Sequence, residues 1–330
     1  MNLTSKSLIY LIGVILFLIS FIGMIYFGYK TFYIEAENNM APQEYTYHFA
    51  LIAEESANDY WRLIEQGAKE AAKEHDIYLE YVAPQKADND EMLKLLDRMI
   101  SAQVDGIITQ GIEGDRFIDI VHKATERGIP VVTVDTDIKS SERKAYVGTD
   151  NFYAGQLLGN AIIDHTSGEQ YVGVVTGRFD AVNQQERLEG LKDVIKDHPR
   201  IQIVSIKESN ITEVGATQAT YSMLKEYPSI TALVGTSALD GFGMVEGLRE
   251  IAPNKDLYMV AFDVLPETLQ LILQERIDGT ISQAPKEMGY SSVEVMLDLQ
   301  TGDLLKNEFF TETKLIQKHD LEAEENGVRR

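Results

Sequence analysis

The residues best suited to chemistry in this sequence stand directly after short apolar runs. Asn58, Tyr60 and the single tryptophan, Trp61, follow the run at 47–53, and Asp135 closes the run VVTVD. Later runs are followed by further polar side chains, namely Asp180, Asn183, Ser237, Asp240, Asp263 and Gln283. Amide and carboxylate groups pair with hydroxyls, and aromatic rings stack on the C–H faces of sugars. The set therefore suits a polyhydroxylated ligand, since hydrogen bonds to charged groups contribute about 1.5–3 kcal/mol each.

Each of these residues also has a simpler interpretation, which the sequence leaves open. Asp135 and Asp263 could cap helices at strand-to-helix turns. Tyr60 and Trp61 could be core residues at the start of a helix, because aromatic side chains are often largely buried. Gln283 alone indicates nothing. The binding interpretation depends on all of them falling at the ends of strands.

Alternating strand-like and helix-like segments are expected to position these residues. A helical pattern over Tyr60–His75 follows the first strand, and Gly128 is predicted to stop a later helix. Strands that are apolar on both faces and alternate with helices indicate parallel sheets covered by helices. The predicted strands cover 47–53, 77–83, 106–109, 130–135, 171–176, 201–206, 231–236, 257–262 and 279–285.

These strands are too many for one compact sheet, and they divide near Asp150. The fold class is therefore predicted as α/β, with two doubly wound parallel-sheet lobes that bind a ligand outside the carboxyl ends of their strands. The chain should cross between lobes near Thr149–Asp150, near Gln283 and near Phe310–Glu312, which makes a hinge of three strands. The expected parts are an N-terminal transmembrane anchor (1–34), a linker (35–45), lobe I (46–149 with 284–311), lobe II (150–283 with 312–318) and a C-terminal tail (319–330).

The N-terminal segment has the composition of a membrane anchor. The run from Leu8 to Tyr29 carries no charge, and roughly 20 apolar residues span a bilayer as a helix. A secretory signal has a shorter apolar core of about 7–15 residues and small residues at its cleavage site. Here the bulky Phe32 and Tyr33 follow instead. We expect an uncleaved single-pass anchor with the binding domain on the extracytoplasmic side; a cleaved signal with a degenerate site is the alternative.

Composition excludes several classes of function. The net charge of -22 argues against a nucleic-acid partner, because such proteins need Lys and Arg to replace counterions on phosphate. The absence of cysteine excludes disulfides, thiolate metal sites, thiol nucleophiles and a lipoprotein anchor. The six histidines show no metal-ligand spacing. No nucleophile elbow, P-loop or dinucleotide fingerprint is present, so neither an enzyme nor a cofactor is expected.

Several longer motifs resemble the type I periplasmic sugar-binding proteins, in particular the ribose, xylose and galactose binders. The resemblance runs from about Tyr47 to about Ile316. The motifs are ANDYWRLIEQGAKEAAKE, VDGIIT, GIPVVTVDTD, VGTDNFYAGQ, ERLEGL, ALVGTSALDGFG, VAFD and GTISQAPKEMGY.

The resemblance implies contacts with a bound sugar. Asn58, Tyr60 and Trp61 would line the wall of the first lobe, and Asp135 would bind adjacent hydroxyls. Asp263 and Gln283 would reach the sugar from the second lobe and the hinge.

At three further candidate ligand-binding positions the sequence departs from the ribose binders. Thr136 and Gln185 stand where those proteins have Arg, and Ser237 stands where they have Asn. The loss of both arginines argues against ribose itself, but leaves a pentose or hexose monosaccharide as the expected ligand.

An anchored binder of this family resembles the sugar-sensing subunits that act beside membrane sensor kinases. Tethering raises the effective concentration of the binder near one partner. The expected function is a sugar sensor for a membrane histidine kinase of a two-component system. The alternative is the substrate-binding component of an ABC sugar importer, whose partner would be a permease.

Overall fold

The computed structural model describes residues 5–32, 45–302 and 306–325. The chain divides into two compact units, residues 1–44 and 45–330. The predicted linker at 35–44 and the end of the predicted tail, 326–330, lie outside the described residues.

The N-terminal unit contains one helix, α1 (Ser5–Phe32). Side chains are described for Tyr10 and for residues 13–28 of this helix, and the large hydrophobic ones among them are mostly exposed. Within the described part of the chain, no helix is long and apolar enough to cross a membrane.

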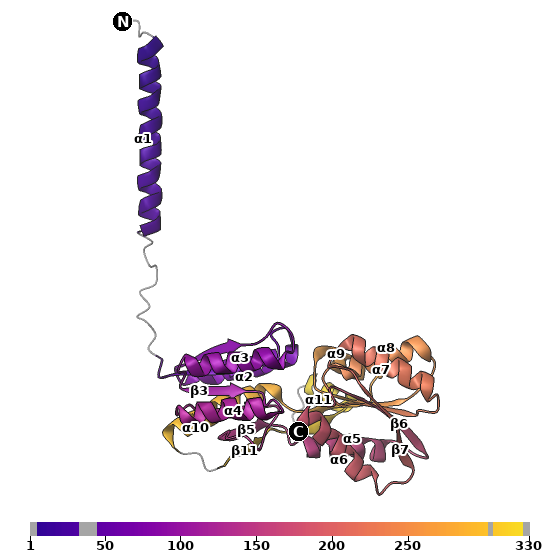
Figure 1. Ribbon diagram of the computed structural model, residues 1–330. Coiled ribbons are helices and arrows are strands. Elements are labelled where there is room, and N and C mark those ends of the chain that lie inside the picture. The colour runs from indigo at the N-terminus through magenta and orange to yellow at the C-terminus, as the bar shows by residue number, and fades with distance from the viewer. Residues whose placement is uncertain (1–4, 33–44, 303–305, 326–330) are drawn as a thin grey trace. The chain divides into compact units, whose positions relative to one another are not determined.

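The C-terminal unit contains two six-stranded sheets, each with helices on both faces (Figure 1). The first sheet has the order β11-β5-β4-β3-β1-β2, and all of its pairs are parallel. Its strands are β1 (Tyr47–Ile52), β2 (Ile77–Val82), β3 (Gly106–Thr109), β4 (Val131–Val134), β5 (Ala145–Gly148) and β11 (Glu308–Phe310). The helices of this lobe I are α2 (Asp59–Glu74), α3 (Asn89–Ser101), α4 (Asp115–Glu126) and α10 (Pro285–Thr301).

The second sheet has the corresponding order β12-β10-β9-β8-β6-β7. Its strands are β6 (Gln170–Thr176), β7 (Ile201–Glu208), β8 (Ala232–Gly235), β9 (Tyr258–Phe262), β10 (Gly279–Ser282) and β12 (Lys314–Ile316), of which β12 alone pairs antiparallel. The helices of this lobe II are α5 (Asn151–His165), α6 (Val182–Ile195), α7 (Glu213–Glu226), α8 (Asp240–Ile251), α9 (Pro266–Leu273) and α11 (Lys318–Glu325). The predicted α/β fold with two parallel-sheet lobes is confirmed.

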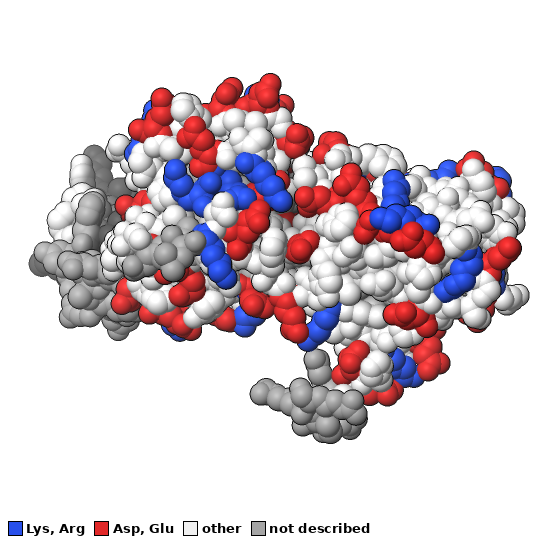
Figure 2. Space-filling model, turned by 90° about the horizontal axis from the view of Figure 1, so that it is seen from below, with Lys and Arg blue, Asp and Glu red and all other residues white. Residues whose placement is uncertain are grey.

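Each lobe has two hydrophobic cores, one on either face of its sheet. In lobe I, α2 and α10 cover one face and α3 and α4 the other. In lobe II, α5 and α6 lie opposite α7, α8 and α9. Central strands such as β3, β4 and β8 are buried along their whole length, as expected for strands with helices on both sides. Acidic side chains are spread over the surface in Figure 2, in keeping with the net charge of -22.

Local sequence signals explain where several helices begin and end. The side chain of Asn58 accepts a hydrogen bond from the backbone of Tyr60 and caps α2. Gly128, two residues past the end of α4, has a φ of +76°, so the predicted helix stop is confirmed. Three strands were not predicted, namely β5, β11 and β12.

Three backbone connections pass between the two sheets. A residue in one of these connections makes hydrogen bonds to the other two. The connections are β5 to α5, β10 to α10, and β11 to β12. The Thr149 hydroxyl donates to Gln283 Oε1 at 2.8 Å, and the Thr311 hydroxyl donates to the Gln283 carbonyl at 2.9 Å. Gln283 therefore links all three connections at the place where the lobes meet.

Candidate functional site

A small polar cavity of about 50 Å³ lies between the lobes, at the carboxyl ends of both sheets. Its wall comes largely from the loops and helix starts that follow strands, since parallel strands end at the same edge of a sheet. It is lined by Glu54, Asn58, Tyr60, Trp61, Gln110 and Asp135 from lobe I, and by Arg178, Ala181, Asn183, Gln184, Arg187, Ile211, Ser237, Ala238, Asp263 and Gln283.

Asp135 is the most highly connected carboxylate of the cavity. The Tyr60 hydroxyl donates to its Oδ1 at 2.6 Å, and the Thr136 hydroxyl donates to its Oδ2 at 2.8 Å. The Gln110 amide and, from lobe II, the Asn183 amide each lie 3.4 Å from Oδ2. The Asp135 carboxylate thus gathers donors from both lobes.

Asp263 occupies the matching position in lobe II. Asp135 follows β4 and Asp263 follows β9, which have the same place in the two strand orders. Both residues have left-handed backbone, with φ of +66° and +70°. Neither carboxylate caps a helix, because the next helices have Asp150 and Leu265 as their N-caps. The capping interpretation therefore fails for both residues.

Arg187 is a fully buried cation that holds the lobe II wall together. From α6 it donates to Asn151 Oδ1 at 2.8 Å, to the Thr236 carbonyl at 2.8 Å and to Gln283 Oε1 at 3.0 Å. Its guanidinium carbon lies 3.8 Å from the centroid of the Phe262 ring. These bonds satisfy the buried charge and orient Gln283, whose Nε2 donates to Asp263 Oδ1 at 2.7 Å.

Burial raises the pKa of several acidic side chains in and beside the cavity. It raises the pKa of Asp263 to about 7, against the opposing effect of Arg187. Burial likewise raises the pKa of Asp240 to about 6. Burial and the neighbouring Asp135 raise the pKa of Tyr60 well above its usual range, so its hydroxyl stays protonated and acts as a donor. Burial raises the pKa of Glu54, opposed by Arg178.

An ion pair joins the lobes at the edge of the cavity. Arg178 Nη2, in the β6–α6 loop of lobe II, lies 2.7 Å from Glu54 Oε1 at the end of β1 in lobe I. Glu54 is nearly buried, and the Arg178 side chain is 24% exposed. Together with the contact between Asn183 and Asp135, this pair holds the two walls in a closed arrangement.

Most of the predicted site residues line this one cavity, and two do not. Thr136 is buried but lies on an adjoining cavity, and its hydroxyl supports Asp135. Gln185 is exposed and donates to the Phe179 carbonyl at 2.7 Å. Those that the structure brings together are Asn58, Tyr60, Trp61, Asp135, Ser237, Asp263 and Gln283.

Other cavity residues were missing from the predicted set. Glu54 and Gln110 follow β1 and β3, so a search for polar side chains after apolar runs could have found them. Asn183 also fell at a strand end in the sequence, whereas Arg187 lies inside α6 and carries no such signal. Asp240, another strand-end residue, instead accepts hydrogen bonds from the backbone of Thr236 and Ser237.

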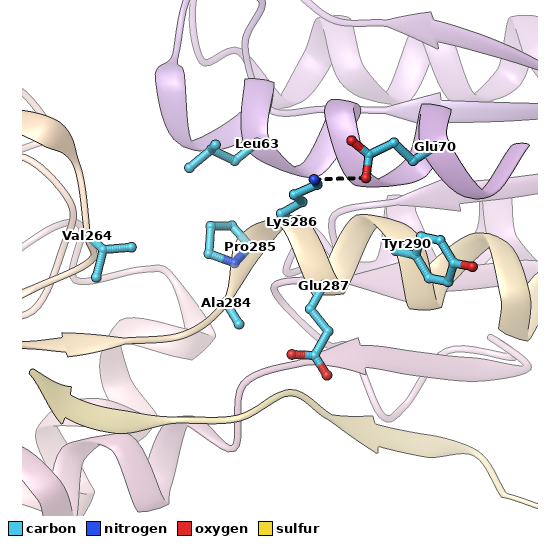
Figure 3. Close-up of a pocket in the computed structure, with 8 residues that line it drawn as sticks. All are labelled: Leu63, Glu70, Val264, Ala284, Pro285, Lys286, Glu287 and Tyr290. Carbon is cyan, nitrogen blue, oxygen red and sulfur yellow. Dashed lines mark ion pairs between the residues drawn. The ribbon is translucent and has the colours of Figure 1, made fainter. Parts of the chain in front are cut away.

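A larger groove of about 590 Å³ lies outside this site (Figure 3). Leu63, Val264 and Pro285 give it an apolar lining, and an ion pair of 2.8 Å joins Glu70 and Lys286 beside it. It lacks the converging carboxylates and amides of the smaller cavity, so we place the candidate site in the latter. Among the described residues, no group of His, Asp and Glu side chains is arranged to hold a metal ion.

The chain is similar in sequence and fold to known binding proteins. Residues 49–304 match the model of the periplasmic binding protein domain. A glucose-galactose binding protein, GanP from Geobacillus stearothermophilus, is 44% identical, with a TM-score of 0.81. The alignment covers 84% of this chain and 99% of that one.

Two further solved structures are similar. A structure of the XylFII-LytSN complex contains a chain that is 35% identical, with a TM-score of 0.77 and coverage of 83% of this chain and 98% of that one. An ABC transporter solute-binding protein from Burkholderia graminis, in complex with D-arabinose, is 26% identical, with a TM-score of 0.80. That alignment covers 84% of this chain and 97% of the other.

Proposed function

This chain belongs to the type I periplasmic sugar-binding proteins, and from that premise we propose a membrane-anchored extracytoplasmic receptor. The receptor closes its lobes on a monosaccharide, a hexose or a pentose, and does not change it chemically. A membrane sensor kinase of a two-component system then reads the closed form.

The observation that carries the binding role is the pairing of Asp135 and Asp263. They follow equivalent strands of the two lobes and line the same cavity. A ligand that donates hydroxyls to both carboxylates binds the closed form better than the open form, and so shifts the population toward closure. Tyr60 and Trp61 supply the aromatic surface against which a sugar ring can pack.

The relatives support a small neutral sugar as ligand. Two of the similar structures are described as a glucose-galactose binder and an arabinose complex. Isothermal titration calorimetry of the full chain in detergent tests this with D-glucose, D-galactose, D-xylose and L- and D-arabinose. We expect at least one of these sugars to bind with a dissociation constant in the micromolar range or below. Absence of heat with all of them would remove the proposal.

The kinase partner is proposed because the XylFII relative is described in a complex with LytSN. The importer role is the second candidate, favoured by the relative described as an ABC transporter solute-binding protein. Co-purification with the extracytoplasmic domain of a sensor kinase and with a permease, each with and without sugar, separates the two. If the protein is a sensor, sugar should change its binding to the kinase domain and should not change its binding to the permease.

The membrane anchor is proposed from the uncharged run Leu8–Tyr29, which continues at both ends beyond the described side chains at 13–28. The exposed apolar side chains of α1, such as Phe17, Ile19 and Ile22, would face lipid. We expect the protein in the membrane fraction, released by detergent and not by high salt, with its N-terminal residues retained. Mature protein that begins near residue 40 would contradict the anchor.

A further inference from the structure

We propose that the cleft contains a second subsite, next to the monosaccharide cavity, which binds the second ring of a disaccharide. The inference rests on the proposed sugar-binding function and extends it from a single ring to a glycoside. The ring in the inner cavity would carry its glycosidic substituent outward into this subsite.

A second cavity of about 190 Å³ adjoins the inner one. Gln110, Arg178 and Ala181 line both, so the two spaces share a wall within one cleft. Lobe I contributes the loop after β3, residues 110–113, and lobe II contributes the loop after β6, residues 178–182. A ligand occupying both spaces therefore touches both lobes in each of them.

The lining of the outer cavity suits a sugar. Gln110 and Thr136 form a buried polar floor, and Asn89, Glu113 and Asp180 form an exposed rim. Amides, a hydroxyl and carboxylates are the groups that pair with sugar hydroxyls. The side chains of Ile112 and Val182 offer apolar surface for the C–H face of a ring.

One donor on the shared wall makes no hydrogen bond to the described residues. This donor is the buried Nε of Arg178, whose ion-pair contact with Asp180 Oδ1 is 3.8 Å long, beyond hydrogen-bond distance. The same guanidinium pairs through Nη2 with Glu54 on the inner side. A buried unpaired donor is costly, so an oxygen of a ligand that crosses this wall, such as the glycosidic oxygen, would be stabilised here.

The outer cavity is the larger of the two spaces. In the closed arrangement it has about 190 Å³, against about 50 Å³ in the inner cavity. A substituent on the inner sugar would thus meet open, polar space and not a wall of protein.

Calorimetry of the full chain in detergent tests the subsite with matched pairs of sugars. Each of D-glucose, D-galactose and D-xylose is compared with its methyl glycosides and with disaccharides that carry it at the non-reducing end, such as cellobiose, maltose, lactose and xylobiose. We expect at least one disaccharide to bind as tightly as its monosaccharide or more tightly.

Variants of the rim then separate the two subsites. Asn89→Ala and Glu113→Gln should each weaken that disaccharide about 3- to 20-fold, in line with the loss of one hydrogen bond, and leave the monosaccharide within about twofold. Glu91→Gln, an exposed carboxylate of α3 outside the cavity, should change neither. If monosaccharides bind and no disaccharide or methyl glycoside does, or if the rim variants leave disaccharide affinity unchanged, the subsite is wrong. If no sugar of any kind binds, the proposed function fails, and the subsite with it.

Discussion

Two aspartates in left-handed backbone are the residues on which the proposed sugar binding most depends. A positive φ is uncommon outside glycine, and Asp is among the residues that tolerate it best. The same left-handed conformation occurs at Asp135 and Asp263, which follow corresponding strands of the two lobes. The backbone therefore directs both carboxylates into the cleft in the same way. Strained positions of this kind cluster at ligand sites, where the surrounding structure maintains them.

Replacing Asp135 by asparagine keeps the shape of the side chain and removes its charge. Hydrogen bonds to a charged acceptor contribute about 1.5–3 kcal/mol each, so Asp135→Asn should weaken sugar binding at least about tenfold to a hundredfold. The carboxylate accepts from Tyr60 and Thr136, which then meet a weaker acceptor. Calorimetry measures the affinity, and circular dichroism checks the fold. Asp119→Asn, on the exposed surface of α4, is the matched control; equal affinities in both variants would return Asp135 to a structural role.

Asp263 should make the stability of the protein depend on pH. Burial raises its pKa from the ordinary 3.8 to about 7 in the folded chain. Between these values the folded state holds a proton that the unfolded state releases, so the free energy of unfolding falls as pH rises through this range. Above about pH 7 the full cost of the buried charge is present.

The test is the melting temperature of wild type and Asp263→Asn at pH 5, 6, 7 and 8, without sugar. The wild type should lose more stability than the variant between pH 5 and pH 8. Asp240, whose pKa is raised to about 6, remains in both proteins and leaves some shared pH dependence. Parallel curves for the two proteins would show that Asp263 does not titrate in this range.

The candidate site could be predicted in part because strand ends are visible in a sequence. Asp135, Asp263 and Gln283 follow apolar runs, and parallel strands bring such positions to one edge. Arg187 could not be found in this way, since it lies one turn inside α6 and reaches the cavity only through tertiary packing. Gln185 stands in the same helix, but its side chain turns to the solvent side.

At the scale of elements, close helix crossings support the walls of the cleft. A methyl group on Gly67 of α2 would lie 1.8 Å from the Lys286 carbonyl oxygen, and one on Gly289 of α10 would lie 1.9 Å from that of Ile64. Lobe II repeats the arrangement, with Gly155 against Arg187 and Gly190 against Phe152. In each lobe, the two helices of the crossing, α2 with α10 and α5 with α6, are thus fixed by backbone contact.

Adding one methyl group should disturb such a crossing. Gly289→Ala must separate α2 from α10, because the obstructing atom is backbone, and overpacking of this kind costs typically about 1–3 kcal/mol. Urea unfolding of the variant should show that loss. Gln66→Ala, on the exposed side of α2, should stay within about 0.5 kcal/mol of the wild type. A Gly289→Ala protein of unchanged stability would mean that the helices are free to move apart.

The main strands could be predicted and the edge strands could not, for a physical reason. Strands buried on both faces, such as β3 and β4, need continuous apolar sequence, which is visible in the chain. In contrast, β11 and β12 have three residues each, lie at sheet edges and are partly exposed. They are recognised as strands only by their hydrogen bonds to a neighbouring strand, which the sequence does not reveal. The third strand that was missed, β5, has only four residues between a loop and α5.

At the scale of the whole molecule, cavity and hinge share one residue. Gln283 contacts Asp263 and Arg187 in the site, and Thr149 and Thr311 in the other two connections. A change in the lobe angle should therefore act directly on the groups that we propose to bind the ligand. The groove of Figure 3 lies next to the same connection, with Val264 and Ala284 adjacent in sequence to Asp263 and Gln283. Its width should change with the lobe angle as well.

Closure can be followed directly because the chain has no cysteine of its own. The exposed Glu91 of α3 and Val214 of α7 each lie in the first turn of a helix that follows a strand, and hence on the cleft side of their lobes. Spin labels on Glu91→Cys and Val214→Cys measure the distance between the lobes. The closed arrangement places Arg178 against Glu54. A sugar that bridges the lobes should favour this arrangement and shorten the distance between the labels.

The ion pair between Arg178 and Glu54 should set how far the chain closes without sugar. Glu54→Gln removes the pair but preserves the size of the side chain, so the label distance in the absence of sugar should shift toward longer values. Because the ligand still bridges the two lobes in this variant, saturating sugar should still produce the short distance, at a higher sugar concentration. Lys69, which pairs with Glu65 on the exposed face of α2, provides the control variant Lys69→Gln, with no expected change. If saturating sugar leaves the label distance of the wild type unchanged, the lobes do not move on binding, and a membrane partner could not detect the ligand through closure.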